Sequence, residues 1–263
     1  MTSRITQTFQ ELKKTNKKAL ITYITAGDPS IEITEELVYA MEKEGGDIIE
    51  LGIPYSDPLA DGPVIQRAAA RALDHATNVD KIFNTIEKMR KKTQVPLVFL
   101  LYFNSIFRYG IERFISNCKN TGVDGLIIPD LPFEERVSLQ KILEGHDIDL
   151  IPLVAPTSEE RIKRIVKNAT GFIYCVSSLG VTGVRDDFGN IDDFMRKVRN
   201  STDLPLSIGF GISDRTAILR LKDLADGLIV GSAIIKKIEE GIPQGNSIIL
   251  VKEFVHELKS ALQ

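Results

Sequence analysis

Short apolar segments alternate with amphipathic segments of helical period along the chain, and this alternation restricts the possible folds more than any other feature. Several apolar segments are apolar at nearly every position, which is typical of parallel strands covered on both faces. We expect strands at residues 20–25, 48–52, 97–102, 125–129, 150–154, 171–176, 206–210 and 227–230. We expect helices between them at residues 35–44, 79–92, 111–120, 134–144, 159–168, 191–199 and 214–221.

Strands that alternate with helices in this number predict an α/β fold, a (β/α)8 TIM barrel. Barrels of this kind run to about 250 residues as one domain, so we interpret residues 1–263 as a single barrel domain. A doubly wound parallel sheet is the structural alternative. Ile5, Phe9 and Leu12 share one helical face, which indicates an extra N-terminal helix that could plug the barrel bottom.

Cap signals stand before two of the expected helices. Thr157 and Ser158 precede Glu159, and Ser213 precedes Asp214. A hydroxyl side chain before acidic first-turn residues favours a helix start, so we expect hydroxyl caps at both places.

Composition excludes several classes of protein. The net charge of −3 argues against a general binder of nucleic acid or of anionic membranes. No apolar run approaches the roughly 18 residues of a membrane span, and the N-terminus lacks the apolar stretch of a signal peptide. Cys118 and Cys175 form no disulfide framework and are interpreted as small core residues in a reducing compartment. We therefore expect a cytoplasmic location.

Glu50 and Asp61 bracket the most informative segment of the sequence. Glu50 lies in the apolar run 48–51, where a carboxylate is costly unless it is paired, hydrogen-bonded or neutralised. The loop that follows carries Asp57 and Asp61 and is stiffened by prolines. The functional interpretation is a general acid–base pair, with one group on a rigid strand and one on a movable loop. A salt-bridged strand end beside a capped turn is the structural alternative.

The position of these carboxylates fits a catalytic role in a barrel. Reactive groups in such barrels lie at the C-terminal ends of strands and in the loops that follow. Glu50 falls at the end of the second strand, and Asp61 lies in the long loop after it. That loop, residues 53–78, is much longer than a usual βα connection, which suggests a lid or a partner-binding element. Its residues 64–73 indicate a short extra helix.

Glycine turns at the other end of the chain predict a phosphate site. Gly209, Phe210 and Gly211 close the seventh strand, and Gly231 and Ser232 close the eighth and open a helix. Glycines allow close backbone approach to an anion, and helix N-terminal N–H groups point at it. The loops after strands seven and eight are the usual phosphate site of this fold. Residues 180–183 could complete the cradle, and tight turns without a ligand are the alternative.

Several other chemistries lack their residues. The expected strands six to eight end without the lysine that a Schiff-base aldolase needs. His75, His146 and His256 stand away from strand C-termini, so a metal site is not expected. The carboxylates are therefore expected to do the chemistry without a metal or a cofactor.

The chain resembles the tryptophan synthase α subunit across essentially its whole length. The matching segments are residues 25–29, 50–63, 129–132, 180–183, 209–212 and 231–233. The resemblance implies cleavage of indole-3-glycerol phosphate to indole and glyceraldehyde 3-phosphate, a lyase step of tryptophan biosynthesis. It also implies an α2β2 heterotetramer with the β subunit, which carries pyridoxal phosphate and receives the indole.

The implied reaction assigns roles to the two carboxylates. Glu50 would deliver a proton to indole C3 and then take the proton of the adjacent side-chain hydroxyl. Asp61 would accept a hydrogen bond from the ring N–H. We expect the apolar surroundings of Glu50 to raise its pKa, and we expect Asp61 to stay ionised on a more open loop.

Further site residues follow from the resemblance. Tyr23 stands where some relatives have phenylalanine, so its hydroxyl needs a partner or water. Expected substrate-binding residues are Tyr23, Leu100, Tyr102, Ile127, Leu153, Tyr174, Thr182, Gly183, Phe210, Gly211, Gly231 and Ser232. Expected residues of the β-subunit interface are Pro54, Asp57, Asn104 and Pro132. Plain core packing is the alternative for the aromatic and aliphatic members.

Two other functions remain open from sequence. One is a regulatory partner of the β subunit without catalysis, against which the presence of both Glu50 and Asp61 argues. The other is a free-standing lyase that releases indole.

Overall fold

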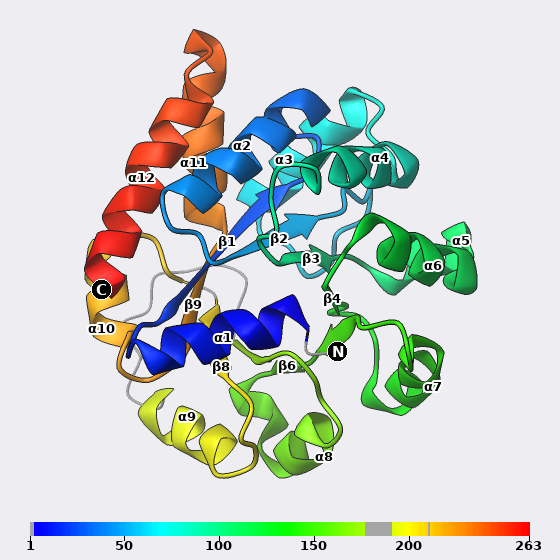
Figure 1. The fold of residues 1–263 in the computed structure, drawn as a ribbon, viewed down its shortest axis with the longest axis vertical. Coiled ribbons are helices and arrows are strands. Elements are labelled where there is room, and N and C mark those ends of the chain that lie inside the picture. Colours follow the sequence, from blue (N-terminus) through cyan, green and yellow to red (C-terminus); the bar gives the residue numbers. More distant parts are fainter. Residues whose placement is uncertain (1–2, 177–190, 210) are drawn as a thin grey trace.

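Parallel strands surrounded by helices make up the computed structural model, which describes residues 3–176, 191–209 and 211–263 apart from the side chains of residues 159 and 160 (Figure 1). The sheet runs in the order β5-β4-β3-β2-β1-β9-β8-β7-β6. Its strands are β1 (Ala19–Thr25), β2 (Ile48–Gly52), β3 (Leu97–Leu100), β4 (Gly125–Ile127), β5 (Asp149–Ile151), β6 (Leu153–Val154), β7 (Ile173–Val176), β8 (Leu206–Gly209) and β9 (Gly227–Val230).

Pro152 explains why one expected strand is divided. β5 pairs with β4, β6 pairs with β7, and only Pro152 separates β5 from β6. Proline has no N–H to donate, which interrupts the hydrogen-bond ladder. Its carbonyl still accepts from Tyr174 N–H at 3.0 Å. The expected strand 150–154 is thus one strand in two parts, and it closes the barrel. The doubly wound alternative is wrong.

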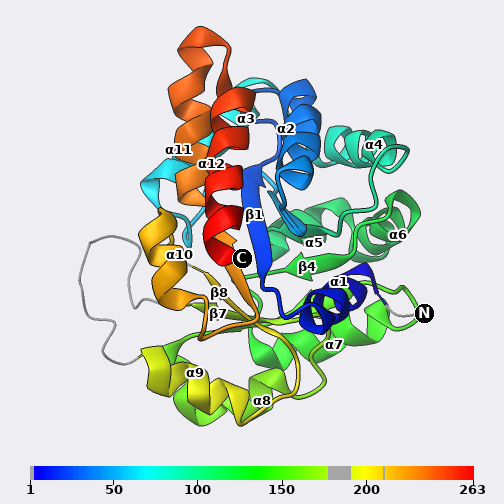
Figure 2. The same cartoon turned by 60° about the vertical axis from the view of Figure 1, so that its left-hand side comes forward.

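Helices lie around the outside of the barrel and across one of its ends. They are α1 (Arg4–Lys14), α2 (Ile31–Lys43), α3 (Pro63–Asp74), α4 (Val79–Met89), α5 (Phe103–Tyr109), α6 (Ile111–Thr121), α7 (Phe133–Leu143), α8 (Ile162–Val166), α9 (Ile191–Arg199), α10 (Arg215–Leu221), α11 (Ser232–Gly241) and α12 (Ser247–Leu262). Short 3-10 helices are η1 (Pro156–Arg161) and η2 (Ile242–Gln244). α11 and α12 lie side by side along one flank (Figure 2). Within the described residues, no helix is both long and apolar enough to cross a membrane.

Local capping accounts for the boundaries that differ from expectation. Ser30 accepts from Ile33 N–H, so α2 begins four residues before the predicted start. Ser158 forms no cap, because residues 156–161 are a 3-10 helix with proline in its first turn. Asp214, rather than Ser213, caps α10 by accepting from Ala217 N–H at 2.9 Å. Both expected hydroxyl caps are therefore wrong.

The N-terminal helix plugs one end of the barrel, as expected. Ile5 and Phe9 of α1 are buried in an inner apolar cluster with strand residues such as Ile48 and Ile151. The rings of Phe9 and Phe172 lie 5.7 Å apart between centroids. Figure 1 shows α1 crossing the end of the barrel. Apolar side chains of α1 and the strands therefore fill this end of the barrel.

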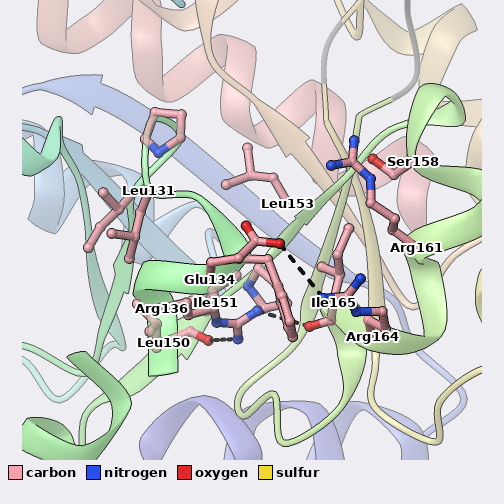
Figure 3. Close-up of a pocket in the computed structure, with 14 residues that line it drawn as sticks. Leu131, Glu134, Arg136, Leu150, Ile151, Leu153, Ser158, Arg161, Arg164 and Ile165 are labelled. Carbon is pink, nitrogen blue, oxygen red and sulfur yellow. Dashed lines mark hydrogen bonds and ion pairs between the residues drawn. The ribbon is translucent and has the colours of Figure 1, made fainter. Parts of the chain in front are cut away.

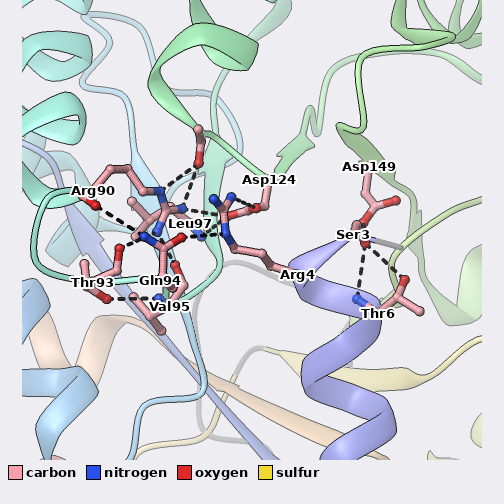
Figure 4. Close-up of polar contacts among 11 residues, drawn as sticks. Ser3, Arg4, Thr6, Arg90, Thr93, Gln94, Val95, Leu97, Asp124 and Asp149 are labelled. Carbon is pink, nitrogen blue, oxygen red and sulfur yellow. Dashed lines mark hydrogen bonds and ion pairs between the residues drawn. The ribbon is translucent and has the colours of Figure 1, made fainter. Parts of the chain in front are cut away.

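Polar contacts fix α1 in this position (Figure 4). Ser3 caps α1 by accepting from Thr6 N–H, and its hydroxyl donates to Asp149 at 2.7 Å. Arg4 pairs with Asp124 at 2.7 Å. The other oxygen of Asp124 accepts from Arg90 at 2.6 Å and from the N–H of Leu97 at 2.8 Å. The plug is thereby joined to the starts of β3, β4 and β5, and the opposite, C-terminal ends of the strands form the open mouth.

Candidate active site

Glu50 lies in the wall of the barrel near its mouth. It sits on β2 in register with Tyr23 of β1 and Val98 of β3, and only 1% of its surface is exposed. Among the described residues, no group donates a hydrogen bond to its Oε2 and no cation pairs with it. Burial raises the pKa of Glu50 to about 8, and the nearby charge of Asp61 adds to this rise. A salt-bridged strand end does not describe this carboxylate.

Asp61 lies in the loop between β2 and α3, where it is half-buried. Burial raises its pKa to about 6, while a hydrogen bond from the Tyr102 hydroxyl holds that pKa down. A pKa of about 6 leaves Asp61 mostly ionised at pH 7, as expected, although its surroundings are less open than expected. The Tyr102 hydroxyl also accepts from Ala60 N–H at 2.8 Å. Tyr102 therefore holds the loop and its carboxylate against the end of β3.

Two buried tyrosines complete the surroundings of Glu50. Burial raises the pKa values of Tyr23 and Tyr174, and the charges of Glu50 and Asp61 raise both further, so these groups share one electrostatic environment. The Tyr23 hydroxyl lies 3.2 Å from Thr25 Oγ1, which is the partner its sequence position required.

Glycines make room for these rings. A Cβ at Gly52 would lie 2.2 Å from the Tyr23 hydroxyl, and one at Gly209 would lie 2.4 Å from the Tyr174 hydroxyl. Real Cβ atoms do not approach this closely, so any larger residue would displace a ring. The glycines that end β2 and β8 thus define the shape of the mouth.

Apolar side chains of the next strands lie beside Tyr174. Ile127 is buried in the same inner cluster as Tyr174, and Leu100 and Leu153 pack against that cluster. The structure therefore brings together the expected indole-pocket residues of β3, β4, β6 and β7. A flat aromatic ring suits such an apolar wall with a few polar groups.

The expected phosphate site is described in part. Gly211, just after β8, has φ +77° and no heavy atom within 4 Å of a built Cβ. Gly231 follows the neighbouring strand β9 and is the N-cap of α11, whose first residue is Ser232. Helix N-terminal N–H groups and open backbone suit an anion. Thr182, Gly183 and Phe210 lie outside the described residues.

The expected interface residues gather on loops at the mouth. Asn104 donates to the Tyr55 hydroxyl at 2.9 Å, and the Tyr55 ring stacks on Tyr102 at 5.2 Å. These contacts join the loop after β2, which carries Pro54 and Asp57, to the start of α5. Pro132 precedes α7 on the loop after β4. This loop is joined to the same rim through Asp130, which accepts from the N–H of Phe103 at 2.8 Å.

One ionic network near the mouth was not expected from sequence. Arg71 of α3 donates to both oxygens of the buried Asp28, at 2.7 and 2.9 Å. Arg71 also donates to Glu239 of α11 at 3.0 Å, and Arg67 binds Glu239 through two hydrogen bonds of 2.8 Å. The network links the helix that follows Asp61 to the helix that begins at Ser232. The one sequence signal was Asp28, a carboxylate three residues after the end of an apolar strand.

Metal ligands do not gather in the described part of the chain. No group of three or more His, Cys, Asp or Glu side chains there is arranged to hold an ion. His256 instead lies 3.2 Å from Glu44 on the outer surface.

Comparisons with known proteins agree with this geometry. A family model described as tryptophan synthase alpha chain matches residues 9–263. The tryptophan synthase alpha chain of Alkaliphilus metalliredigens (strain QYMF) is 58% identical over 259 residues, which are 98% of this chain and 97% of that protein. The tryptophan synthase alpha chain of Thermoanaerobacter sp. (strain X514) is 52% identical over 261 residues, which are 99% of this chain and 100% of that protein.

Solved structures are similar over the same length. The crystal structure of tryptophan synthase subunit alpha from Legionella pneumophila str. Paris has a TM-score of 0.92 at 34% identity, and the match covers 100% of this chain and 99% of that one. A chain of Mycobacterium tuberculosis tryptophan synthase has a TM-score of 0.90 at 33% identity, with coverage of 100% and 99%.

Proposed function

The chain belongs to the tryptophan synthase alpha chain family, whose reaction is the cleavage of indole-3-glycerol phosphate, and we propose that Glu50 and Asp61 are the acid–base groups of this cleavage. The reaction is a carbon–carbon lyase step of tryptophan biosynthesis that yields indole and glyceraldehyde 3-phosphate. The observation that carries the proposal is the buried Glu50 carboxyl group, with a pKa of about 8 and an unpartnered Oε2 among the described residues. Carboxyl groups with strongly shifted pKa values at a barrel mouth are typical of catalytic sites.

The bond to be broken joins indole C3 to the glycerol side chain, and an intact aromatic ring is a poor leaving group. Protonation of C3 with loss of the ring N–H proton gives an indolenine, which accepts the bonding electron pair. Glu50 is mostly protonated at pH 7, so it can donate the proton to C3. Its carboxylate then takes the proton of the adjacent hydroxyl as the aldehyde forms.

Asp61 serves the nitrogen end of the ring. It is mostly ionised at pH 7, so it can accept the ring N–H proton and return it when the carbon–carbon bond breaks. The Tyr102 hydroxyl orients the Asp61 carboxylate and, through Ala60 N–H, the loop that carries it. The two carboxyl groups therefore divide the proton transfers between them, as their different surroundings allow.

The phosphate of the substrate binds, in this proposal, to main-chain N–H groups after β8 and β9. Gly211 and Ser232 supply them among the described residues, and Gly231 leaves space for close approach. Thr182, Gly183 and Phe210 complete the site by their place in the family pattern. The ring rests among Tyr23, Leu100, Tyr102, Ile127, Leu153 and Tyr174.

The proposed partner is the tryptophan synthase β subunit, in an α2β2 assembly in the cytoplasm. The rim that carries Pro54, Asp57, Asn104 and Pro132 faces it, and indole passes from this chain to the β subunit. Pyridoxal phosphate belongs to the β subunit, and no cofactor or metal is proposed for this chain.

The test is indole release from indole-3-glycerol phosphate by the purified chain, with and without the β subunit. Glu50→Gln is nearly isosteric, so the fold should persist while turnover falls by about 10²–10⁴-fold or more. Glu36→Gln, an exposed change on α2, is the matched control and should keep full activity. Turnover by Glu50→Gln near that of the control would refute the assignment. A wild-type chain that is inactive in both conditions would identify a regulatory partner instead.

A further inference from the structure

A cavity of about 280 Å³ lies between α7, the η1–α8 segment and the barrel wall, and its lining includes Leu153 of the expected indole pocket (Figure 3). Its walls are partly apolar and partly polar, with Ile128 just after β4, Leu150 from β5 and Ile165 from α8 among the apolar residues. Three guanidinium groups and one carboxylate also line it, those of Arg136, Arg161, Arg164 and Glu134. The lining thus combines apolar surface with an excess of positive charge.

Arg136 is the most constrained of these groups. Only 6% of its surface is exposed, and it donates to the carbonyls of Ile165 and Leu150, each at 2.9 Å. Among the described residues its Nε has no hydrogen-bond partner, and no carboxylate pairs with it. A buried charge without a counter-ion costs free energy, and burial here lowers the pKa of Arg136 to about 10. An anion in the cavity would offset that cost.

The two other arginines form no close ion pair within the described part of the chain. Arg164 lies over the ring of Phe133, and its distance to the Glu134 carboxylate is 3.7 Å, too long for a strong pair. Arg161 takes part in no ion pair within the described part of the chain. Exposed pairs of this kind hold their partners weakly, so both guanidinium groups are available to a ligand.

We propose that this cavity is a binding site for a small carboxylate with an apolar body. The carboxylate takes hydrogen bonds from the arginine guanidinium groups, which match its two oxygens in a planar fork. The apolar body contacts Ile128, Leu150 and Ile165, surface that a simple inorganic anion would leave uncovered. The site is separate from the glycine turns of the proposed phosphate site, because α7 and α8 follow strands on another part of the barrel.

Calorimetric titration of the full chain with benzoate tests the proposal, with benzamide as the uncharged analogue and inorganic phosphate as the anion without an apolar body. Benzoate should bind at least about tenfold more tightly than either, since each charge-assisted contact contributes this order of affinity. Arg136→Gln should abolish binding but also removes two hydrogen bonds of the fold. The decisive variant is therefore Arg161→Gln combined with Arg164→Gln, which should weaken benzoate binding about tenfold or more.

Arg113→Gln is the matched control. Arg113 stacks on Tyr109 and lies 3.7 Å from Asp80, as Arg164 does with Phe133 and Glu134, but it lies on α6 away from the cavity. This variant should bind benzoate as the wild type does. The proposal is overturned if the wild type does not bind benzoate, if benzamide or phosphate binds as tightly, or if the double variant and Arg113→Gln bind alike.

Discussion

Glu50 and Asp61 are similar carboxyl groups whose surroundings give them different pKa values, about 8 and about 6. Burial raises both pKa values. Among the described residues, only Asp61 receives a hydrogen bond that stabilises its charged form, and the donor is Tyr102. At pH 7 the first is mostly protonated and the second mostly ionised. A proton donor and a proton acceptor therefore coexist in one site at this pH.

The pH dependence of cleavage follows from these protonation states. The kcat/KM for indole release should rise through pH about 6 as Asp61 ionises and fall through pH about 8 as Glu50 loses its proton. Tyr102→Phe removes the hydrogen bond that lowers the Asp61 pKa, so the acid limb should move to higher pH while the alkaline limb stays. A pH profile of the variant with an unmoved or lowered acid limb would contradict the role of Tyr102.

Burial of Glu50 should also lower stability at high pH. Its pKa is raised from 4.5 to about 8 on folding, so the folded state binds more protons between these values. The favourable contribution of Glu50 to the free energy of unfolding is present below pH about 4.5 and is lost as pH rises through about 8. Glu50→Gln should therefore increase the free energy of unfolding at pH 9, by a few kcal/mol, and change it little at pH 4. Denaturant titration at both pH values, with Glu36→Gln as control, measures this; a variant less stable than wild type at pH 9 would argue against it.

At the scale of elements, the strands were predictable because a buried parallel strand is apolar along its length. The predicted element boundaries were wrong where a local feature decides them, as with Pro152 inside the fifth strand and Ser30 at the start of α2. Glu50 and Asp61 could be found because they stand out against an apolar run. The contacts of Arg71 could not be predicted. Asp28 is 43 positions away from Arg71 in the sequence and Glu239 is 168 positions away, so only the folded chain brings them together.

The link between α3 and α11 should help to align the two halves of the site. Glu239 bridges Arg67 and Arg71 of α3, whereas Glu240, its neighbour, pairs with Lys237 of its own helix at 2.7 Å and, among the described residues, with no other cation. Glu239→Gln should lower kcat and raise KM by about threefold to tenfold, because small misplacements of reacting groups reduce rates strongly. The loss of stability should stay near 1 kcal/mol, since the pair is partly exposed.

Glu240→Gln is the control for that experiment and should keep both kinetic constants. Steady-state assays and thermal unfolding of the two variants separate positioning from stability. Equal kinetics for both variants would mean that the α3–α11 link is only structural.

At the scale of the whole molecule, the two ends of the barrel have different tasks. α1 fills one end with Ile5 and Phe9 and is tied there through Arg4 and Ser3. The other end keeps its strand termini open for the carboxylates and the glycine turns. A rigid plug at one end would allow the loops at the mouth to move without loss of the core.

The loop after β2 should be the element that couples docking of the β subunit to catalysis. In the free chain Leu59 is 92% exposed, and hydrogen bonds from Ala60 N–H to the Tyr102 hydroxyl and from the Asn104 amide to the Tyr55 hydroxyl hold the loop at the rim. Contact with the β subunit and substrate would cover Leu59 and move Asp61 toward the ring nitrogen. Hydrogen exchange of residues 54–65 should therefore slow markedly in the complex with substrate, while exchange in α1 stays unchanged. Equal protection of residues 54–65 in both states would mean that the loop is already formed in the free chain, and another element would have to carry the coupling.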